Sequence, residues 1–164
     1  AGAEMALRYV ERAALPAALP ERWQRVLLNT VIKSCANAGD CGQAEQYFNE
    51  LRGRRIEPNG KTFGKLIEAG AKAGDYLAAE RWWAELQRAG FESKVEEYSM
   101  LMDAAVKSAD AATAERWFQL AAEAGITPNV VTFTTLVDAA AKEGDLARAE
   151  HWLKYAAGAG VRPN

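Results

Sequence analysis

Apolar side chains near the end of the chain recur at the spacing of one helix face. Positions i, i+3, i+4 and i+7 of this segment are Phe133, Leu136, Val137 and Ala140. This is the period of an amphipathic α-helix, in which such residues share a single stripe. The pattern therefore predicts a helix over residues Thr132–Lys142.

A Gly-Asp pair ends this first pattern, and a second apolar pattern follows it. Gly144 can adopt the left-handed conformation that ends many helices. Asp145 can accept hydrogen bonds from the free N–H groups that open the next helix. The second helix is predicted near Leu146–Ala157, with Ala149 and Trp152 turned toward the first.

The two-helix pattern recurs with a period of 35 residues. At this shift the Gly-Asp turn, a later Ala-Glu pair and a large aromatic residue stay in register, except that the third repeat has Ala109-Asp110 in place of Gly-Asp. Four repeats follow one another without an insertion, at 25–59, 60–94, 95–129 and 130–164. Two short helices cannot bury their apolar faces alone, so neighbouring pairs must stack. We therefore expect an all-α fold, a right-handed α-solenoid of stacked helix–turn–helix pairs.

Residues 1–24 follow the repeat less closely. Gly2–Ala13 is predicted to be the second helix of an incomplete preceding repeat, because it carries an Ala-Glu pair. A linker that contains Pro16 and Pro20 would follow, up to residue 24. Both ends of the chain are expected to be cut from a longer array.

The last repeat, which begins VVTFTTLVDA and ends AGVRPN, resembles the pentatricopeptide repeat family. The resemblance extends over Arg25–Asn164. The tetratricopeptide repeat is the nearest alternative, but its period is 34 residues. Over four repeats that difference would displace the last match by four positions, whereas the columns stay aligned at 35.

This resemblance implies binding of single-stranded RNA, with one nucleotide per repeat, in a mitochondrion or chloroplast. In the family, the residues at the fifth and last places of each repeat read the base. The base-reading pairs implied here are Asn29 with Asn59, Ser99 with Asn129, and Thr134 with Asn164. An aliphatic residue at the second place, Val26 or Val131, would sandwich the base. By this analogy the first repeat would prefer a pyrimidine, with cytosine favoured, and the third and fourth would prefer adenine.

The residue types suit this chemistry independently of the resemblance. Short hydroxyl and amide side chains can hydrogen-bond the Watson–Crick edge of an unstacked base. Ser, Thr and Asn are also common helix caps, so each of them taken singly has a purely structural alternative. The second repeat (60–94) departs from the pattern, since Gly64 has no side chain and Lys94 is charged. We expect a base to be read weakly or not at all there.

One lysine stands at the thirteenth place of three repeats, near the end of each first helix. These are Lys72, Lys107 and Lys142. The resemblance implies that they contact phosphates. The alternative is that each stabilises the C-terminus of its own helix, a contribution of about 0.3–1 kcal/mol.

The overall charge gives no general signal for a nucleic-acid partner. The chain has 20 Lys and Arg against 22 Asp and Glu, a net charge of −2, and residues 95–129 carry two cations and six anions. A protein–protein scaffold subunit of an organellar complex is therefore kept as an alternative function. The tryptophans of the second helices are predicted to pack between repeats rather than stack on bases: Trp82, Trp83, Trp117 and Trp152.

Several other classes of protein are disfavoured. Cys35 and Cys41 are too few for a disulfide framework or a zinc site. A single histidine, His151, makes most metal sites and nucleophile–base pairs unlikely to form, so neither catalysis nor a cofactor is expected. No stretch approaches the roughly 20 apolar residues of a membrane-spanning helix.

Overall fold

The computed structural model describes residues 19–107, 111–127 and 129–160 of the 164-residue chain. Within this described part, all regular secondary structure is α-helical. The chain divides into two compact units, an N-terminal unit of residues 1–92 and a C-terminal unit of residues 93–164. Each unit contains two complete helical hairpins among its described residues.

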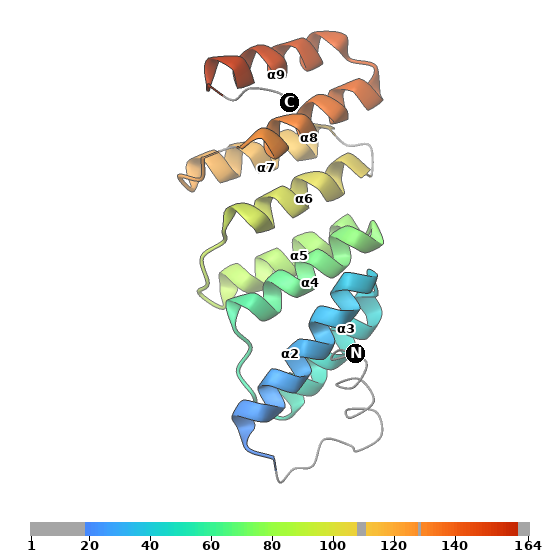
Figure 1. The fold of residues 1–164 in the computed structure, drawn as a ribbon, viewed down its shortest axis with the longest axis vertical. Coiled ribbons are helices and arrows are strands. Elements are labelled where there is room, and N and C mark those ends of the chain that lie inside the picture. The colour runs from blue at the N-terminus through green and yellow to red at the C-terminus, as the bar shows by residue number, and fades with distance from the viewer. Residues whose placement is uncertain (1–18, 108–110, 128, 161–164) are drawn as a thin grey trace. The chain divides into compact units, whose positions relative to one another are not determined.

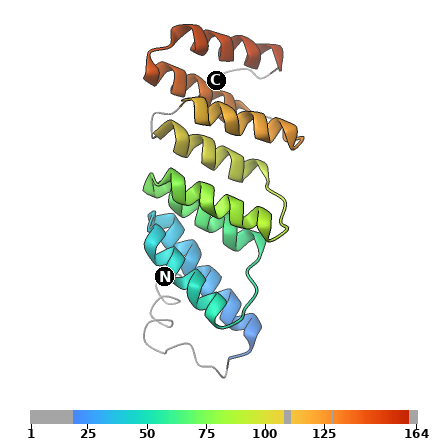
Figure 2. The same cartoon turned by 180° about the vertical axis from the view of Figure 1, so that it is seen from behind.

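The N-terminal unit contains four described helices. They are α2 (Glu21–Ala38), α3 (Cys41–Gly53), α4 (Gly60–Ala73) and α5 (Tyr76–Arg88). Helix α2 packs against both α3 and α4, and α4 packs against α5. The first helices of the two hairpins, α2 and α4, form one layer of this unit, and α3 and α5 form the opposite layer (Figures 1 and 2).

The C-terminal unit repeats this arrangement. Its helices are α6 (Val95–Lys107), α7 (Ala111–Glu123), α8 (Val130–Glu143) and α9 (Leu146–Gly158). Helix α6 packs against α7 and α8, and α8 packs against α9. The stacked helix–turn–helix pairs predicted from the sequence are therefore present in both units.

The cores contain the residues that the helical periodicity selects. In α8, Phe133, Leu136 and Ala140 are buried. The alanine of the Ala-Glu pair is buried in the second helix of every described hairpin. The residues of this column are Ala44, Ala79, Ala114 and Ala149. Trp82, Trp117 and Trp152 are buried as well, which confirms that these three pack internally.

The Gly-Asp turns have the predicted chemistry. Gly144 ends α8 in the left-handed conformation, with φ +74°. The carboxylate of Asp145 then accepts a hydrogen bond from the backbone N–H of Arg148 at 2.9 Å and caps α9. Asp40 and Asp75 cap α3 and α5 in the same way. Local sequence therefore sets where these three described hairpins turn.

The first described helix is longer than the sequence suggests. Helix α2 begins at Glu21, so residues 21–24, which were expected in a linker, form its first turn. Pro20 precedes this turn, and Glu21 forms an ion pair with Arg25 at 2.5 Å. The helix predicted at Gly2–Ala13 lies outside the described residues.

None of the described helices combines the length and the apolar character needed to cross a bilayer.

Candidate nucleic-acid interface

The turn before α4 is built around two side chains, Asn59 and Thr62. Asn59 is in an extended conformation, and its Oδ1 accepts a hydrogen bond from the backbone N–H of Thr62 at 3.0 Å. In return, the Thr62 hydroxyl oxygen accepts from the backbone N–H of Asn59 at 3.3 Å. This reciprocal pair is a capping box, which satisfies two N–H groups that would otherwise lack partners. Asn59 therefore has a structural role whatever it binds.

The same turn recurs before α8. The Oδ1 atom of Asn129 accepts from the backbone N–H of Thr132 at 3.1 Å, and Thr132 Oγ1 accepts from the backbone N–H of Asn129 at 3.4 Å. In both turns the amide oxygen is committed to the cap. The Nδ2 group of each asparagine, with its two N–H donors, is left to face other partners.

The hydroxyl of Thr62 also reaches the preceding repeat. Its Oγ1 donates a hydrogen bond to Oδ1 of Asn29 in α2, at 2.8 Å. Thr62 is only 2% exposed and Asn29 is half-buried, so this bond is partly shielded from water. The residue at the fifth place of the first repeat is thereby joined to the start of the second.

An open cavity of about 390 Å³ lies beside these groups in the N-terminal unit. It contains Val26, Asn29 and Asn59, which the sequence analysis assigned to one nucleotide, together with Thr62. Val26 is 52% exposed and offers an apolar surface at its edge. The volume of the cavity falls within the usual range for sites that hold small organic ligands. An unpaired base is a group of this kind.

The rest of the lining is Thr30 and three lysines: Lys33, Lys61 and Lys65. None of these three lysines was predicted from the sequence to belong to the interface. The position of Lys33 could have been predicted from the sequence, because it lies four residues after Asn29 and therefore shares its helix face. Lys65 forms an ion pair with Glu68 at 2.5 Å, so Lys33 and Lys61 are the cations that give the cavity a positive edge. The net charge of the chain conceals this edge.

The C-terminal unit carries the remaining predicted residues on α6 and α8. Thr134 is exposed, and its hydroxyl donates to the carbonyl oxygen of Val130 at 2.8 Å. Its oxygen lone pairs therefore remain available to a donor. Val131 is 57% exposed and Ser99 is half-buried. Asn164 lies outside the described residues.

The two residues of the weak second repeat belong to different units. Gly64 is a half-buried residue of α4. Lys94 precedes α6, and its backbone N–H donates to the side chain of Glu97 at 2.8 Å. No capping asparagine stands at this junction, because Lys94 occupies its place.

The three lysines predicted to contact phosphates are already engaged. Lys72 forms an ion pair with Glu68 at 2.7 Å, and Lys107 forms one with Asp103 at 2.6 Å. The Nζ group of Lys142 lies 3.5 Å from the carbonyl oxygen of Val106. Burial would raise the pKa of Glu68, but hydrogen bonds from Lys65 and Lys72 outweigh it and lower that pKa. A phosphate at Lys72 would therefore compete with a stable carboxylate.

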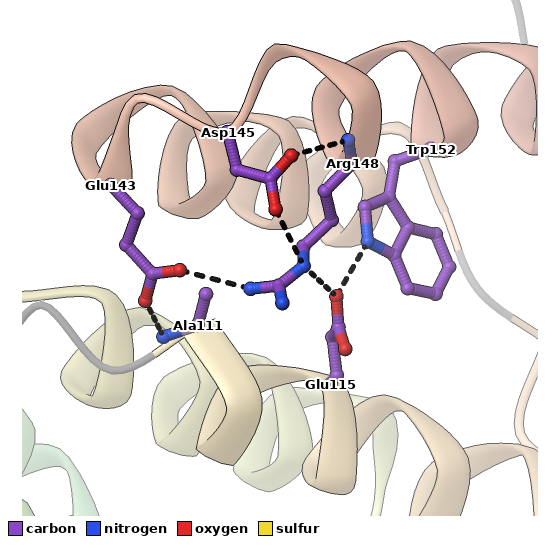
Figure 3. A network of polar contacts seen from close by, with 6 residues as sticks. All are labelled: Ala111, Glu115, Glu143, Asp145, Arg148 and Trp152. Carbon is purple, nitrogen blue, oxygen red and sulfur yellow. Dashed lines mark hydrogen bonds and ion pairs between the residues drawn. The ribbon is translucent and has the colours of Figure 1, made fainter.

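Away from the cavity, a polar network joins the two hairpins of the C-terminal unit (Figure 3). The indole N–H of Trp152 donates to Glu115 Oε1 at 3.0 Å. Arg148 lies between the hairpins, with Nε 3.5 Å from Glu115 and a terminal nitrogen 2.9 Å from Glu143. Glu143 also accepts from the backbone N–H of Ala111 at 2.8 Å. In the N-terminal unit, Trp82 donates in the same way to Glu45 at 3.0 Å. These contacts pair a tryptophan with the Ala-Glu glutamate of the preceding repeat at two places, Trp82 with Glu45 and Trp152 with Glu115.

The described residues contain no group of three or more histidine, cysteine or acidic residues placed to hold a metal ion. His151 is exposed on α9. Cys35 is buried in α2, and burial raises the pKa of its thiol.

Cys41 should react slowly with alkylating reagents. Burial and the neighbouring carboxylates of Glu45 and Asp75 raise the pKa of its thiol to about 11. Only the thiolate is nucleophilic, and an ordinary cysteine has a pKa near 8.5. We expect alkylation of Cys41 by iodoacetamide at pH 8 to be about 100-fold slower than that of the urea-unfolded chain. Its rate should rise about tenfold per pH unit up to pH 10, measured by peptide mass spectrometry. A rate that levels off below pH 9 would contradict the raised pKa.

Solved structures show what class of protein this architecture defines. The crystal structure of the pentatricopeptide repeat protein PPR10 in complex with an 18-nt psaJ RNA element superposes with a TM-score of 0.81 at 22% identity. The alignment covers 99% of this chain and 23% of that one. PPR10 from maize gives a TM-score of 0.75 at 24% identity, with the same shares of the two chains covered. The chain thus spans less than a quarter of the length of PPR10.

A second kind of protein has the same fold. The PPR domain of Arabidopsis thaliana protein-only RNase P 1, in complex with tRNA, superposes with a TM-score of 0.80 at 14% identity. Here 99% of this chain and 84% of the other are covered. These likenesses define the chain as an all-α helical-repeat protein of the solenoid class.

Family models identify the repeat itself. A model of the pentatricopeptide repeat domain matches residues 48–108 and 81–138. Models of the single PPR repeat match residues 26–56 and 124–154. The chain belongs to the pentatricopeptide repeat family. No curated protein sequence matches it closely enough to count as a relative.

Proposed function

We propose that this chain binds single-stranded RNA in a sequence-selective manner, with one repeat for each nucleotide. The observation that carries the proposal is the cavity in which Val26, Asn29 and Asn59 meet. Family membership and the RNA-bound state of PPR10 support it. By the family resemblance, the RNA would be a mitochondrial or chloroplast transcript, and binding would serve its processing, stability or translation.

The hydrogen bonds of the first repeat favour cytosine. Asn29 and Asn59 both have their Oδ1 atoms bonded to Thr62, so each offers N–H donors to a ligand. Cytosine presents two adjacent acceptors, N3 and O2, on its Watson–Crick edge, whereas uracil places an N–H donor between its two carbonyl groups. A pair of donors therefore discriminates between the two pyrimidines. Val26 would cover one face of the base.

The third and fourth repeats favour adenine. Adenine presents an acceptor, N1, beside a donor, the exocyclic amine. Asn129 can donate to N1 through Nδ2, and the hydroxyl oxygen of Ser99 can accept from the amine. Thr134 has its proton committed to Val130 and can likewise accept from an adenine amine. We propose that three lysines contact phosphates, which would replace their present partners: Lys72, Lys107 and Lys142.

A titration with labelled RNA tests this function. We expect RNA containing C-N-A-A to bind about tenfold more tightly than a scrambled sequence of the same composition, the effect of a net gain of about 1.4 kcal/mol. If three or four phosphates are engaged, log Kd should change with log salt with a slope of about 2 to 3. Equal binding of the ordered and scrambled RNAs would contradict the proposal.

Asn129→Asp is the sharpest variant for this test. A carboxylate retains the oxygen that caps α8 but removes both amide donors, so the helix keeps its cap while the base loses its partner. We expect the preference for adenine at the third repeat to fall about tenfold. RNA with guanine at this step should bind more tightly to the variant than to wild type, because guanine offers two N–H donors to the carboxylate. Thermal melting of the variant provides the control for folding.

The alternative function is a protein–protein scaffold within an organellar assembly. The observation in its favour is that Lys72 and Lys107 are neutralised by Glu68 and Asp103, in a chain of net charge −2. If the RNA titration shows no binding and a protein co-purifies with the chain after nuclease treatment, the scaffold replaces the RNA reader.

A further inference from the structure

We infer that Thr62 sets the base preference of the first repeat, although it occupies neither base-reading place. Its hydroxyl fixes which way the Asn29 carboxamide faces and supports the cap made by Asn59. Thr62 is therefore a positioning residue for the cavity. The inference rests on the proposed RNA-binding function.

The geometry around the Thr62 hydroxyl leaves little freedom. Oγ1 lies 2.8 Å from Asn29 Oδ1 and 3.1 Å from Asn59 Oδ1, and it accepts from the Asn59 backbone N–H at 3.3 Å. A hydroxyl has one proton to donate. The Asn59 oxygen already accepts from the Thr62 backbone N–H, so the proton is best used on Asn29, at the shorter distance.

This single bond decides what Asn29 offers to a base. The two ends of a carboxamide differ only in that oxygen accepts and nitrogen donates. With the oxygen held by Thr62, the nitrogen remains for the ligand. Without the hydroxyl, the amide can rotate by half a turn and offer its oxygen, which would accept the N3–H of uracil. The threonine thus acts on selectivity through Asn29.

The other junctions of the chain support this reading. The equivalent of Thr62 before α8 is Thr132, whose hydroxyl bonds Asn129 Oδ1 at 3.2 Å. At the junction between the second and third repeats the equivalent residue is Glu97. The fifth place of the second repeat is Gly64, which has no amide to orient. A threonine at the third place therefore follows the repeats whose fifth residue is polar, with Asn29 and Ser99, and is absent after Gly64.

The test compares cytosine with uracil at the first step. Wild type, Thr62→Val and Thr62→Ser would each be titrated with C-N-A-A and U-N-A-A RNAs. Valine has the shape of threonine without the hydroxyl, and serine retains the hydroxyl. We expect wild type and Thr62→Ser to prefer cytosine by about tenfold and Thr62→Val by about twofold or less, because one oriented hydrogen bond is lost. Thr135→Val is the matched control, since the Thr135 hydroxyl lies in the C-terminal unit and donates to the backbone carbonyl of Val131.

The outcomes separate this inference from the proposed function. If wild type does not bind these RNAs, the proposed function fails. If wild type prefers cytosine and Thr62→Val keeps that full preference, the role of Thr62 is overturned while RNA binding stands. A loss of overall affinity with an unchanged cytosine-to-uracil ratio would likewise mean that Thr62 is only structural.

A measurement on the free wild-type protein makes the test independent of how the valine variant folds. The side-chain amide of Asn29 should be rigid on the picosecond-to-nanosecond timescale, with an NMR order parameter of about 0.8 or more. An order parameter below about 0.6, typical of a flexible group, would show that Thr62 does not hold the amide and would overturn the inference.

Discussion

Trp117→Ala should lower the free energy of unfolding by about 3–5 kcal/mol, the usual cost of truncating a buried aromatic residue. Trp117 is 1% exposed, and its ring packs against that of Tyr98 at an interplanar angle of 62°, with centroids 6.3 Å apart. Alanine would leave a cavity among packed helices that relax only in part. Urea-induced unfolding followed by far-UV circular dichroism would measure the change.

A matched variant separates burial from the loss of a tryptophan as such. Trp23 lies near the start of α2 and is 50% exposed. Trp23→Ala should therefore cost less than about 1 kcal/mol, as surface substitutions usually do. Comparable losses for Trp23 and Trp117 would contradict the packing described for α7.

Gly70→Ala should destabilise the chain, although alanine favours helices by about 1 kcal/mol over glycine. A Cβ atom at Gly70 would lie 2.8 Å from the backbone nitrogen of Ala79 and 3.2 Å from the carbonyl oxygen of Asp75. Backbone atoms cannot rotate away as a side chain can, so α4 and α5 would have to separate. We expect a net loss of about 1–3 kcal/mol, typical of overpacking, measured as a lower urea midpoint.

Gly53→Ala is the control for this substitution. Gly53 is a residue of α3 with no atom within 4 Å of the added Cβ. Gly53 is the last residue of α3, and alanine meets no clash there, so it should stabilise by about 0.5 kcal/mol, the low end of the range for Gly→Ala at a compatible site. A stabilising effect at both glycines would show that α4 and α5 are not in close contact at Gly70.

The helices and turns could be predicted because their causes are local. Gly144 and Asp145 stop one helix and cap the next within a few residues, and the α8 stripe at Phe133 and Leu136 needs only the helical period. The start of α8 was predicted two residues late, at Thr132 rather than Val130. The reason is that Asn129 was considered as a base reader and its action as a cap was not used to place the helix.

The candidate site could be predicted only in part. The repeat register brought Asn29 and Asn59 into one set, and the cavity contains both. The pairing of Lys72 with Glu68 could also have been predicted, since residues four apart share a helix face. The bond between Thr62 and Asn29 could not have been predicted, because it joins residues 33 apart in sequence. A buried threonine in a capping position also has no separate sequence signal.

By itself, the sequence determined the class of this protein, because a period of 35 residues with apolar stripes and turn residues in register can be satisfied only by stacked helical hairpins. Tertiary structure decided which polar groups remain available. The oxygens of Asn29 and Asn59, the charge of Lys72 and the indole N–H of Trp152 are all engaged by partners. A side chain can offer a ligand only what its neighbours have left, and those neighbours are fixed by how the helices pack.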